Sequence, residues 1–410
     1  MSASSFWRHD TGSEGAKMIL GVEKKLLWPA FLIGVLALFL SVPAVLAQST
    51  KDLPPPPPLW RPKPTPTPTP PKPPEAGEID VIKTTSNLVM VPVSITDQQG
   101  QAVQGLKIPD FRLEEEGKHQ EITAIGDPEQ VPLAIAILFD ISSSVGQKGF
   151  FASQQNAAAA FLRQVMKPKD VAAIFTITAT PNVIQPLSTA EASAAKLLTI
   201  PPATSHVPTA FYDTVIAAAK YLTDNAESSY RRVIVVLSDG DDNFSEQIRD
   251  SALADFNASL AAQQPQGTPA NSKQTVQPTR GQLRTVLQQR HQQAVAAVQK
   301  AVQQADVIFY SVNPGGPSIK LNQIAMRAER GMEAIAETTG GTAFVPDSDA
   351  DLERVFRQVG AELRGQYLLQ YYGDSGAPAG QFRRIKVAVP ARADVRVRAR
   401  QGYYPKKPAN

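Results

Sequence analysis

The pattern of hydrophobic and polar positions between residues 131 and 365 changes repeatedly from strand-like to helix-like. Residues 133–139 form a continuous apolar run, as expected of a parallel strand buried on both faces. Apolar residues then recur at helical spacing over 157–166. Further strands are predicted at 171–178, 232–237 and 307–312, and further helices at 209–222, 285–304 and 350–363. This alternation predicts an α/β domain with a doubly wound, mostly parallel sheet that binds ligands at the carboxyl ends of its strands.

Shorter strand patterns flank this domain on both sides. The N-terminal β segment, 79–130, and the C-terminal segment, 366–404, are each too short to bury much surface alone. We therefore expect their strands to pair in one small β-sandwich into which the α/β domain is inserted. The expected strands are 88–95, 111–113 and 120–125 in the first segment, and 366–372, 384–389 and 395–400 in the second.

Residues 1–78 lack the pattern of a globular domain. Lys24 and Lys25 precede an almost wholly apolar stretch that ends in a small-x-small sequence at Ala47, which is typical of a cleaved signal peptide over 1–47. An uncleaved membrane anchor is the alternative, because about 20 apolar residues can span a bilayer. Residues 48–78 are rich in proline and predict an extended polyproline II linker. We expect an exported protein that is periplasmic, membrane-anchored or secreted.

One interval interrupts the α/β pattern. Residues 259–279 are rich in Gln, Pro, Thr and Ser, so we expect a disordered insertion on the surface of the domain.

Composition limits the chemistry that the chain can perform. The 410 residues include no cysteine, which excludes thiolate metal sites, cysteine nucleophiles and disulfides. The four histidines are widely scattered, which does not favour a zinc centre. Any metal should therefore be a hard ion held by oxygen ligands. The net charge of +3 is too close to neutral to indicate nucleic acid as a partner.

Three polar clusters fall at the ends of predicted strands or at the start of a helix. Asp140, Ser142 and Ser144 follow the first buried strand at Asp-x-Ser-x-Ser spacing; Thr209 opens a helix, and Asp239 ends a later strand. A doubly wound sheet brings such positions to one edge. Carboxylate and hydroxyl oxygens of this kind are ligands that hard divalent ions prefer.

These five residues, in this order, resemble the metal-ion-dependent adhesion site of the von Willebrand factor type A domain, which has a Rossmann-like fold. The resemblance implies that these five residues, with only two negative charges, hold Mg²⁺, or alternatively Mn²⁺ or Ca²⁺. It also implies that the metal keeps an open coordination position, which takes an Asp or Glu carboxylate from a partner protein. Two features depart from the family pattern: Pro208 stands where many members have glycine, and the insertion after Asp239 is long. Residues 84–404 resemble more widely a bacterial von Willebrand factor A-related family, through Gly105-Leu106, Asp110-Phe111, Ser238-Asp239-Gly240, Thr339-Gly340-Gly341, Gln366-Tyr367-Leu368-Leu369 and Gly402-Tyr403-Tyr404.

Other interpretations of the same residues remain open. Asp140 and the serines could cap a helix. A serine hydrolase would need a base such as His206, but no G-x-S-x-G elbow surrounds Ser142 or Ser144. A phosphatase with an aspartate nucleophile would lack its second aspartate, because Ser142 occupies that position. The residues favour a binding protein over an enzyme.

The sequence thus predicts an exported, metal-dependent adhesion or scaffolding module. The alternative is a structural envelope protein whose metal site is unoccupied. Asp241 and Asp242 are expected to shape the loop rather than bind metal. The alternating arginines Arg396, Arg398 and Arg400 are interpreted as the solvated face of a strand, with attraction of anionic envelope polymers as the alternative.

Overall fold

A computed structural model describes residues 87–142, 151–203, 207–249, 279–317, 323–373 and 378–405. All of them belong to the unit Asp80–Asn410. The expected signal peptide or anchor, the proline-rich linker, Ser144 and residues 259–278 of the insertion lie outside these ranges. Within them, no helix combines the length and apolar character needed to cross a membrane.

A six-stranded sheet forms the centre of the α/β domain, in the order β10-β9-β8-β5-β6-β7. The edge strand β7 runs antiparallel to β6, and the other neighbouring pairs are parallel. The predicted doubly wound, mostly parallel sheet is confirmed. The strands are β5 (Leu133–Asp140), β6 (Val171–Ile177), β7 (Asn182–Ser188), β8 (Arg231–Leu237), β9 (Val307–Val312) and β10 (Ala343–Phe344).

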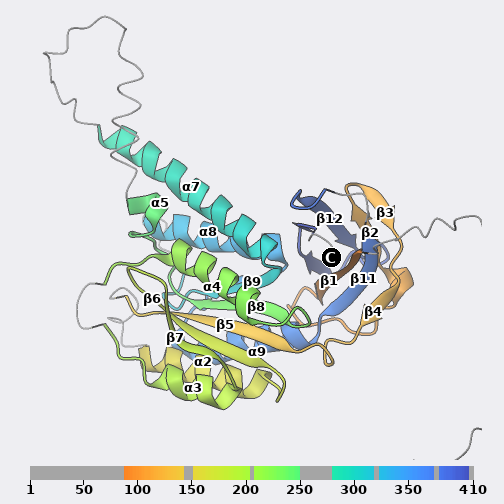
Figure 1. Cartoon of the computed structure of the whole chain (residues 1–410), viewed down its shortest axis with the longest axis horizontal. Coiled ribbons are helices and arrows are strands. Elements are labelled where there is room, and N and C mark those ends of the chain that lie inside the picture. Colours follow the sequence, from red (N-terminus) through yellow and green to blue (C-terminus); the bar gives the residue numbers. More distant parts are fainter. Residues whose placement is uncertain are drawn as a thin grey trace, which may run out of the picture. The chain divides into compact units, whose positions relative to one another are not determined.

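Helices cover both faces of this sheet (Figure 1). Odd-numbered residues from Leu133 to Phe139 pack towards α2, α3 and α9, and even-numbered residues from Ala134 to Leu138 pack towards α4, α7 and α8. A continuous apolar run is therefore what this strand requires. The helices are α2 (Phe151–Val165), α3 (Ala190–Leu198), α4 (Phe211–Asn225), α5 (Glu246–Arg249), α7 (Arg280–Gln304), α8 (Gln323–Thr339) and α9 (Leu352–Arg364), with short 3-10 turns at Ile108–Asp110 and Asp349–Asp351.

Strands from the two ends of the described chain pair to form two four-stranded sheets, β13-β1-β11-β4 and β14-β12-β2-β3. Strand β1 pairs antiparallel with both β11 and β13, while β2 pairs with β12. The two sheets share one apolar core that includes Val91, Leu113 and Leu369. The predicted sandwich of N- and C-terminal strands is confirmed. Its strands are β1 (Asn87–Thr96), β2 (Arg112–Glu115), β3 (Lys118–Gln120), β4 (Ala124–Gly126), β11 (Tyr367–Gly373), β12 (Arg383–Ala388), β13 (Arg396–Ala399) and β14 (Gly402–Tyr403).

The predicted solvated face of three arginines is wrong for two of them. Arg396 is exposed, but Arg398 forms an ion pair with Glu362 of α9 at 2.7 Å. Arg400 is only 9% exposed and pairs with Asp306, just before β9. These pairs, with the hydrogen bond from Arg231 to Gln366, join the sandwich to the α/β domain. We call this contact region the junction.

Candidate metal centre

Asp140 is the last residue of β5 and is completely buried. Because β5 lies beside β8 in register, with Phe139 opposite Leu237, Ser238 follows directly at the same edge of the sheet. The Ser238 hydroxyl donates a hydrogen bond of 2.6 Å to Oδ2 of Asp140, and the Ser142 backbone N–H donates one of 2.8 Å to Oδ1. The orientation of the carboxylate is thus fixed by a donor on each oxygen, and the Ser142 hydroxyl is also hydrogen-bonded to it.

The Asp140 carboxylate lies close to a second negative charge. Burial raises the pKa of Asp140 to about 6, and the charge of Asp239 adds to the shift. Within the described ranges, neither carboxylate forms an ion pair with a lysine or arginine. Two buried or half-buried carboxylates without a cation are unfavourable. A bound cation would relieve this repulsion.

Gly240 turns the chain immediately after Asp239. Its φ of +73° lies in the left-handed region, and its N–H donates a 2.9 Å hydrogen bond to the Ser238 hydroxyl. A Cβ at this position would lie 2.8 Å from the Met332 side chain. The positive φ is the main reason that glycine is favoured here, because the flexible Met332 side chain could move aside. The turn keeps Asp239 beside Asp140.

Thr209 is buried just before α4 and is held by the loop that follows β8. Asn243 accepts a hydrogen bond from the Thr209 N–H at 2.9 Å, and the Thr209 carbonyl accepts from the N–H groups of Asn243 and Phe244. Ala210 in turn donates to Thr178, just beyond β6. The Thr209 hydroxyl has no hydrogen-bond partner among the described residues, so it remains available as a ligand.

Asp242 shapes the loop, as predicted. Its carboxylate accepts hydrogen bonds from the backbone N–H groups of Tyr212, Phe244 and Ser245 and from the Ser245 hydroxyl. Burial raises the pKa of Asp242, and these donors act against that shift. A carboxylate with four donors has little capacity left to bind a metal.

The donor set fits a hard divalent ion. Asp140, Ser142, Thr209 and Asp239 all belong to segments at the carboxyl ends of β5, β6 and β8, and Ser144 lies outside the described residues. In the described ranges, no three Asp, Glu or His side chains are grouped closely enough to hold a metal themselves. An ion here would therefore need the hydroxyl ligands as well as the two carboxylates, all of them oxygen.

Some residues that organise this centre were not predicted from the sequence. Ser238 orients Asp140, and Asn243 holds Thr209. Both belong to the polar run 238–243, which indicated a loop but not these partners. His291 lies against Tyr212 of α4, with 3.2 Å between Nδ1 and the phenol oxygen, and burial lowers its pKa to about 4. The sequence around His291 contains no motif that would predict its contact with Tyr212.

No family model and no curated protein sequence matches the chain. Similar solved structures include proximal thread matrix protein 1 of the mussel byssus with a zinc-occupied MIDAS motif, at 13% identity and a TM-score of 0.39, covering 61% of this chain and 50% of that protein. The von Willebrand factor domain of the type V pilus tip protein of Porphyromonas gingivalis has 13% identity and a TM-score of 0.34, covering 56% and 94%.

An aerotolerance-related membrane protein of Bacteroides fragilis is also similar, with 14% identity, a TM-score of 0.34 and coverage of 56% of this chain and 98% of that chain. The match to the mussel protein spans about half of that protein's length. At these identities the likeness concerns the fold and not the chemistry. The assignment of the centre therefore depends on the sequence motif and on the contacts described above.

Proposed function

We propose that this protein is a divalent-metal-dependent binding module of the von Willebrand factor A type. The observation that carries the proposal is the uncompensated pair of Asp140 and Asp239, with neighbouring hydroxyl ligands, at one edge of a doubly wound sheet. Asp140, Ser142, Ser144, Thr209 and Asp239 would hold Mg²⁺ or Mn²⁺, and Ca²⁺ is the other candidate. When bound, the ion supplies a coordination position for an Asp or Glu carboxylate of a partner protein.

The proposal is of an adhesion or scaffolding protein rather than an enzyme. The Ser142 hydroxyl is hydrogen-bonded to the Asp140 carboxylate. His291 is engaged with Tyr212 and is neutral near pH 7. A hydroxyl that is hydrogen-bonded to a carboxylate suits a metal ligand, whereas a serine nucleophile needs a histidine or other base beside it. Export by residues 1–47, and a partner outside the cytoplasm, are parts of this proposal.

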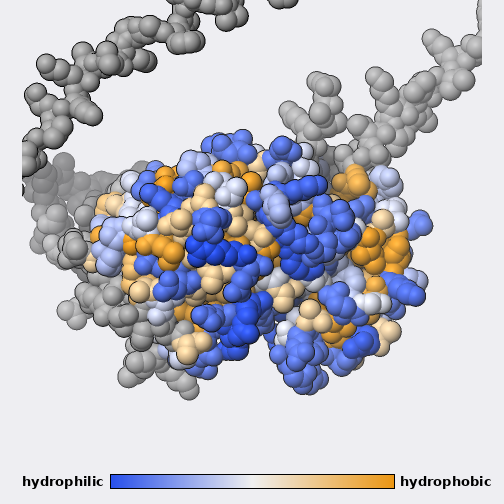
Figure 2. Space-filling model, turned by 90° about the horizontal axis from the view of Figure 1, so that it is seen from below, coloured by the Kyte–Doolittle hydropathy of each residue, from blue (hydrophilic) through white to orange (hydrophobic). Residues whose placement is uncertain are grey.

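Figure 2 shows the hydropathy of one face of the molecule. Over the described residues of that face, hydrophobic residues form separate patches among hydrophilic ones. Partner binding through a metal would draw part of its specificity from charge, because electrostatic complementarity discriminates between partners.

Calorimetric titration with Mg²⁺ and Mn²⁺ tests the metal centre. The wild-type protein should bind one ion, and Asp140→Ala should lose that binding. The matched control is Asp224→Ala, which removes an aspartate that is exposed and paired with Lys220 at 2.6 Å. Equal binding by wild type and Asp140→Ala would refute the proposal.

Partner binding is tested separately by affinity capture from envelope extracts. Proteins should be retained with Mg²⁺, released by a chelator, and absent when Asp140→Ala is the bait. The alternative function, a structural envelope protein with an unoccupied site, predicts the same captured proteins with and without the ion and with either bait.

A further inference from the structure

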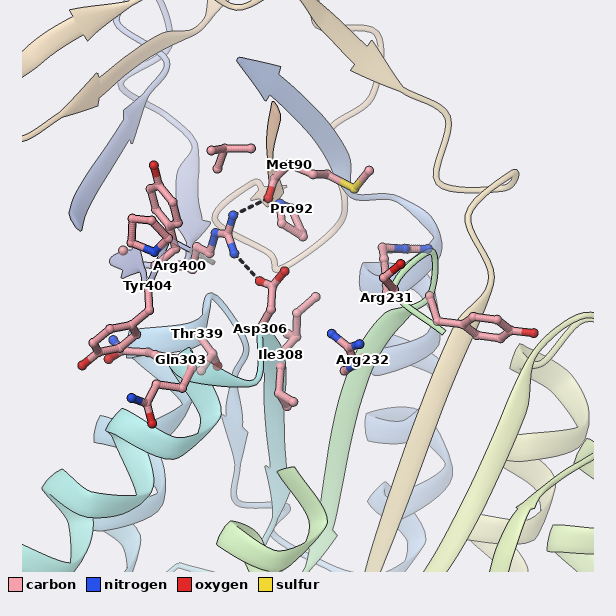
Figure 3. A pocket seen from close by; sticks show the side chains of 18 of the residues that line it. Met90, Pro92, Arg231, Arg232, Gln303, Asp306, Ile308, Thr339, Arg400 and Tyr404 are labelled. Atoms are coloured by element: carbon pink, nitrogen blue, oxygen red, sulfur yellow. Dashed lines mark hydrogen bonds and ion pairs between the residues drawn. The ribbon is translucent and has the colours of Figure 1, made fainter. Parts of the chain in front are cut away.

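A second cavity lies at the junction, at the opposite edge of the central sheet from the metal centre. It encloses about 510 Å³ and is lined by residues at the amino ends of β8 and β9, the carboxyl end of α7, β1 and the last strand. Figure 3 shows side chains from both parts facing the cavity: Met90, Pro92, Arg400 and Tyr404 of the sandwich, and Arg232 and Asp306 of the α/β domain.

Positive charge exceeds negative charge in this pocket. Arg231 and Arg232 are each only 5% exposed, and within the described ranges neither forms an ion pair with a carboxylate. Arg400 does pair with Asp306. Two guanidinium groups therefore remain without a compensating charge, and burial together with the nearby Arg364 lowers the pKa of Arg231 to about 10.

Neutral oxygens hold these two arginines in place. Arg231 donates to the carbonyls of Leu363 and Pro128 and to Gln366. Arg232 donates to the carbonyls of Leu222, Ala226 and Ala305, at the ends of α4 and α7. A cation at a helix carboxyl end is favourable, which explains part of the arrangement of Arg232.

Those contacts leave two buried donors unused. Among the described residues, the Nε–H groups of Arg231 and Arg400 have no hydrogen-bond partner, and solvent does not reach them. An acceptor in the cavity would not reach them either. The guanidinium groups that line the cavity would therefore attract an anion through their charge rather than through these two donors.

The remaining walls of the pocket are apolar or aromatic. Val89, Pro92 and Ile308 line it beside Tyr403 and Tyr404. A volume of about 300–1,000 Å³ at the contact between two domains is typical of small-molecule sites. We propose that the junction pocket binds a small organic anion, a carboxylate or a phosphate ester with an apolar or aromatic body, whose charged group is recognised by the arginines.

Titration of the full-length protein with phenyl phosphate and benzoate tests this site, with benzyl alcohol as the uncharged probe. We expect at least one anion to bind with Kd below about 1 mM and the alcohol to bind at least tenfold more weakly. Binding should persist in chelator and in Asp140→Ala, since the pocket does not use the metal centre.

Two substitutions in the pocket and one control locate the binding. Arg232→Gln should weaken anion binding about tenfold or more, because a charged hydrogen bond is lost. Ser229→Trp, at an exposed position on the pocket wall, should block it. Arg392→Gln removes an exposed arginine that does not line the pocket and should leave the affinity unchanged.

Failure of both anions to bind, or equal binding of the alcohol, overturns the proposal. So does undiminished anion binding by Ser229→Trp, a comparison that holds even where Arg232→Gln does not fold.

Discussion

The ionisation of Asp140 sets the pH response of the metal-free protein. Its pKa in the folded state is about 6, above its ordinary value of 3.8, because it is buried and lies near Asp239. A raised carboxyl pKa means that the folded state favours the proton. The contribution of this raised pKa to the free energy of unfolding is therefore fully present below about pH 4, and it is lost as the pH rises through 6.

The substitution Asp140→Asn tests this directly. In chelator at pH 7.5, it should be more stable than wild type by on the order of 3 kcal/mol, since it removes the buried charge. Near pH 4 the two proteins should differ little. Urea unfolding at both pH values measures the difference, and a wild type that is the more stable protein at pH 7.5 in chelator contradicts the assigned shift.

Gly240 is the residue where backbone conformation most directly supports the centre. Gly240→Ala should destabilise the protein by about 1–2 kcal/mol, because φ is positive, and should also weaken Mg²⁺ binding, because the turn positions Asp239. Gly117→Ala is the matched control: its φ is +77°, but nothing lies within 4 Å of the added Cβ.

Thermal unfolding and metal titration of both glycine variants separate the two effects. We expect both variants to lose a similar amount of stability. Only Gly240→Ala should bind the metal more weakly. Weaker metal binding in both variants would show that general strain, rather than the turn, is responsible.

At the scale of elements, the local sequence pattern predicted the strands of the central sheet that are buried on both faces. Strands β5, β8 and β9 are rich in apolar residues and buried throughout, and their predicted limits agree with the structure to within one residue. The sequence did not predict β7, which is half-exposed and contains Pro186, or α8, whose buried face includes small residues such as Gly331 and Ala336. A proline within a run argues against a strand, which explains why β7 was not predicted. The apolar residues of α8 do recur at helical spacing, so this helix could have been predicted from the sequence.

The arginines of β13 show that the local sequence pattern can also predict the exposure of a side chain wrongly. Arg398 alternates with apolar neighbours as an exposed residue would, but its partner Glu362 lies on another element. The same holds for the candidate centre, where the order of the five predicted ligands was visible in the sequence, and the support from Ser238 and Asn243 was not. Contacts between distant segments depend on the fold and not on spacing.

The Arg398–Glu362 pair gives the prediction at this scale. Both side chains are largely buried, at 17% and 2% exposure, so Glu362→Gln should cost about 3–5 kcal/mol by leaving a buried charge alone. Chemical unfolding of Glu362→Gln, Arg398→Met and the double variant should show the double variant recovering part of that loss.

The exposed pair of Lys220 and Asp224 is the control for this cycle. Its side chains are 75% and 51% exposed, and Asp224→Ala should change stability by less than about 1 kcal/mol. Additive effects in the Arg398 and Glu362 cycle would mean that the two charges are not coupled.

At the scale of the whole molecule, metal binding and folding stability are linked. An ion that binds only the folded state should stabilise it by about 2.7 kcal/mol when present at 100 times its Kd. Thermal unfolding with Mg²⁺ and with chelator should show this difference in wild type and in Asp224→Ala, and not in Asp140→Ala. An unchanged Tm of wild type at saturating Mg²⁺ contradicts the linkage.

The pairing of β1 also limits the order in which the parts of the molecule can fold. Asn87 of β1 lies opposite Gly373 of β11, and both strands that pair with β1 come from the C-terminal segment. Contacts between residues so distant in sequence form late, because a long loop must close first. During synthesis, β1 is therefore expected to remain unpaired until the α/β domain and the C-terminal strands have been made. The sandwich can form only after that point.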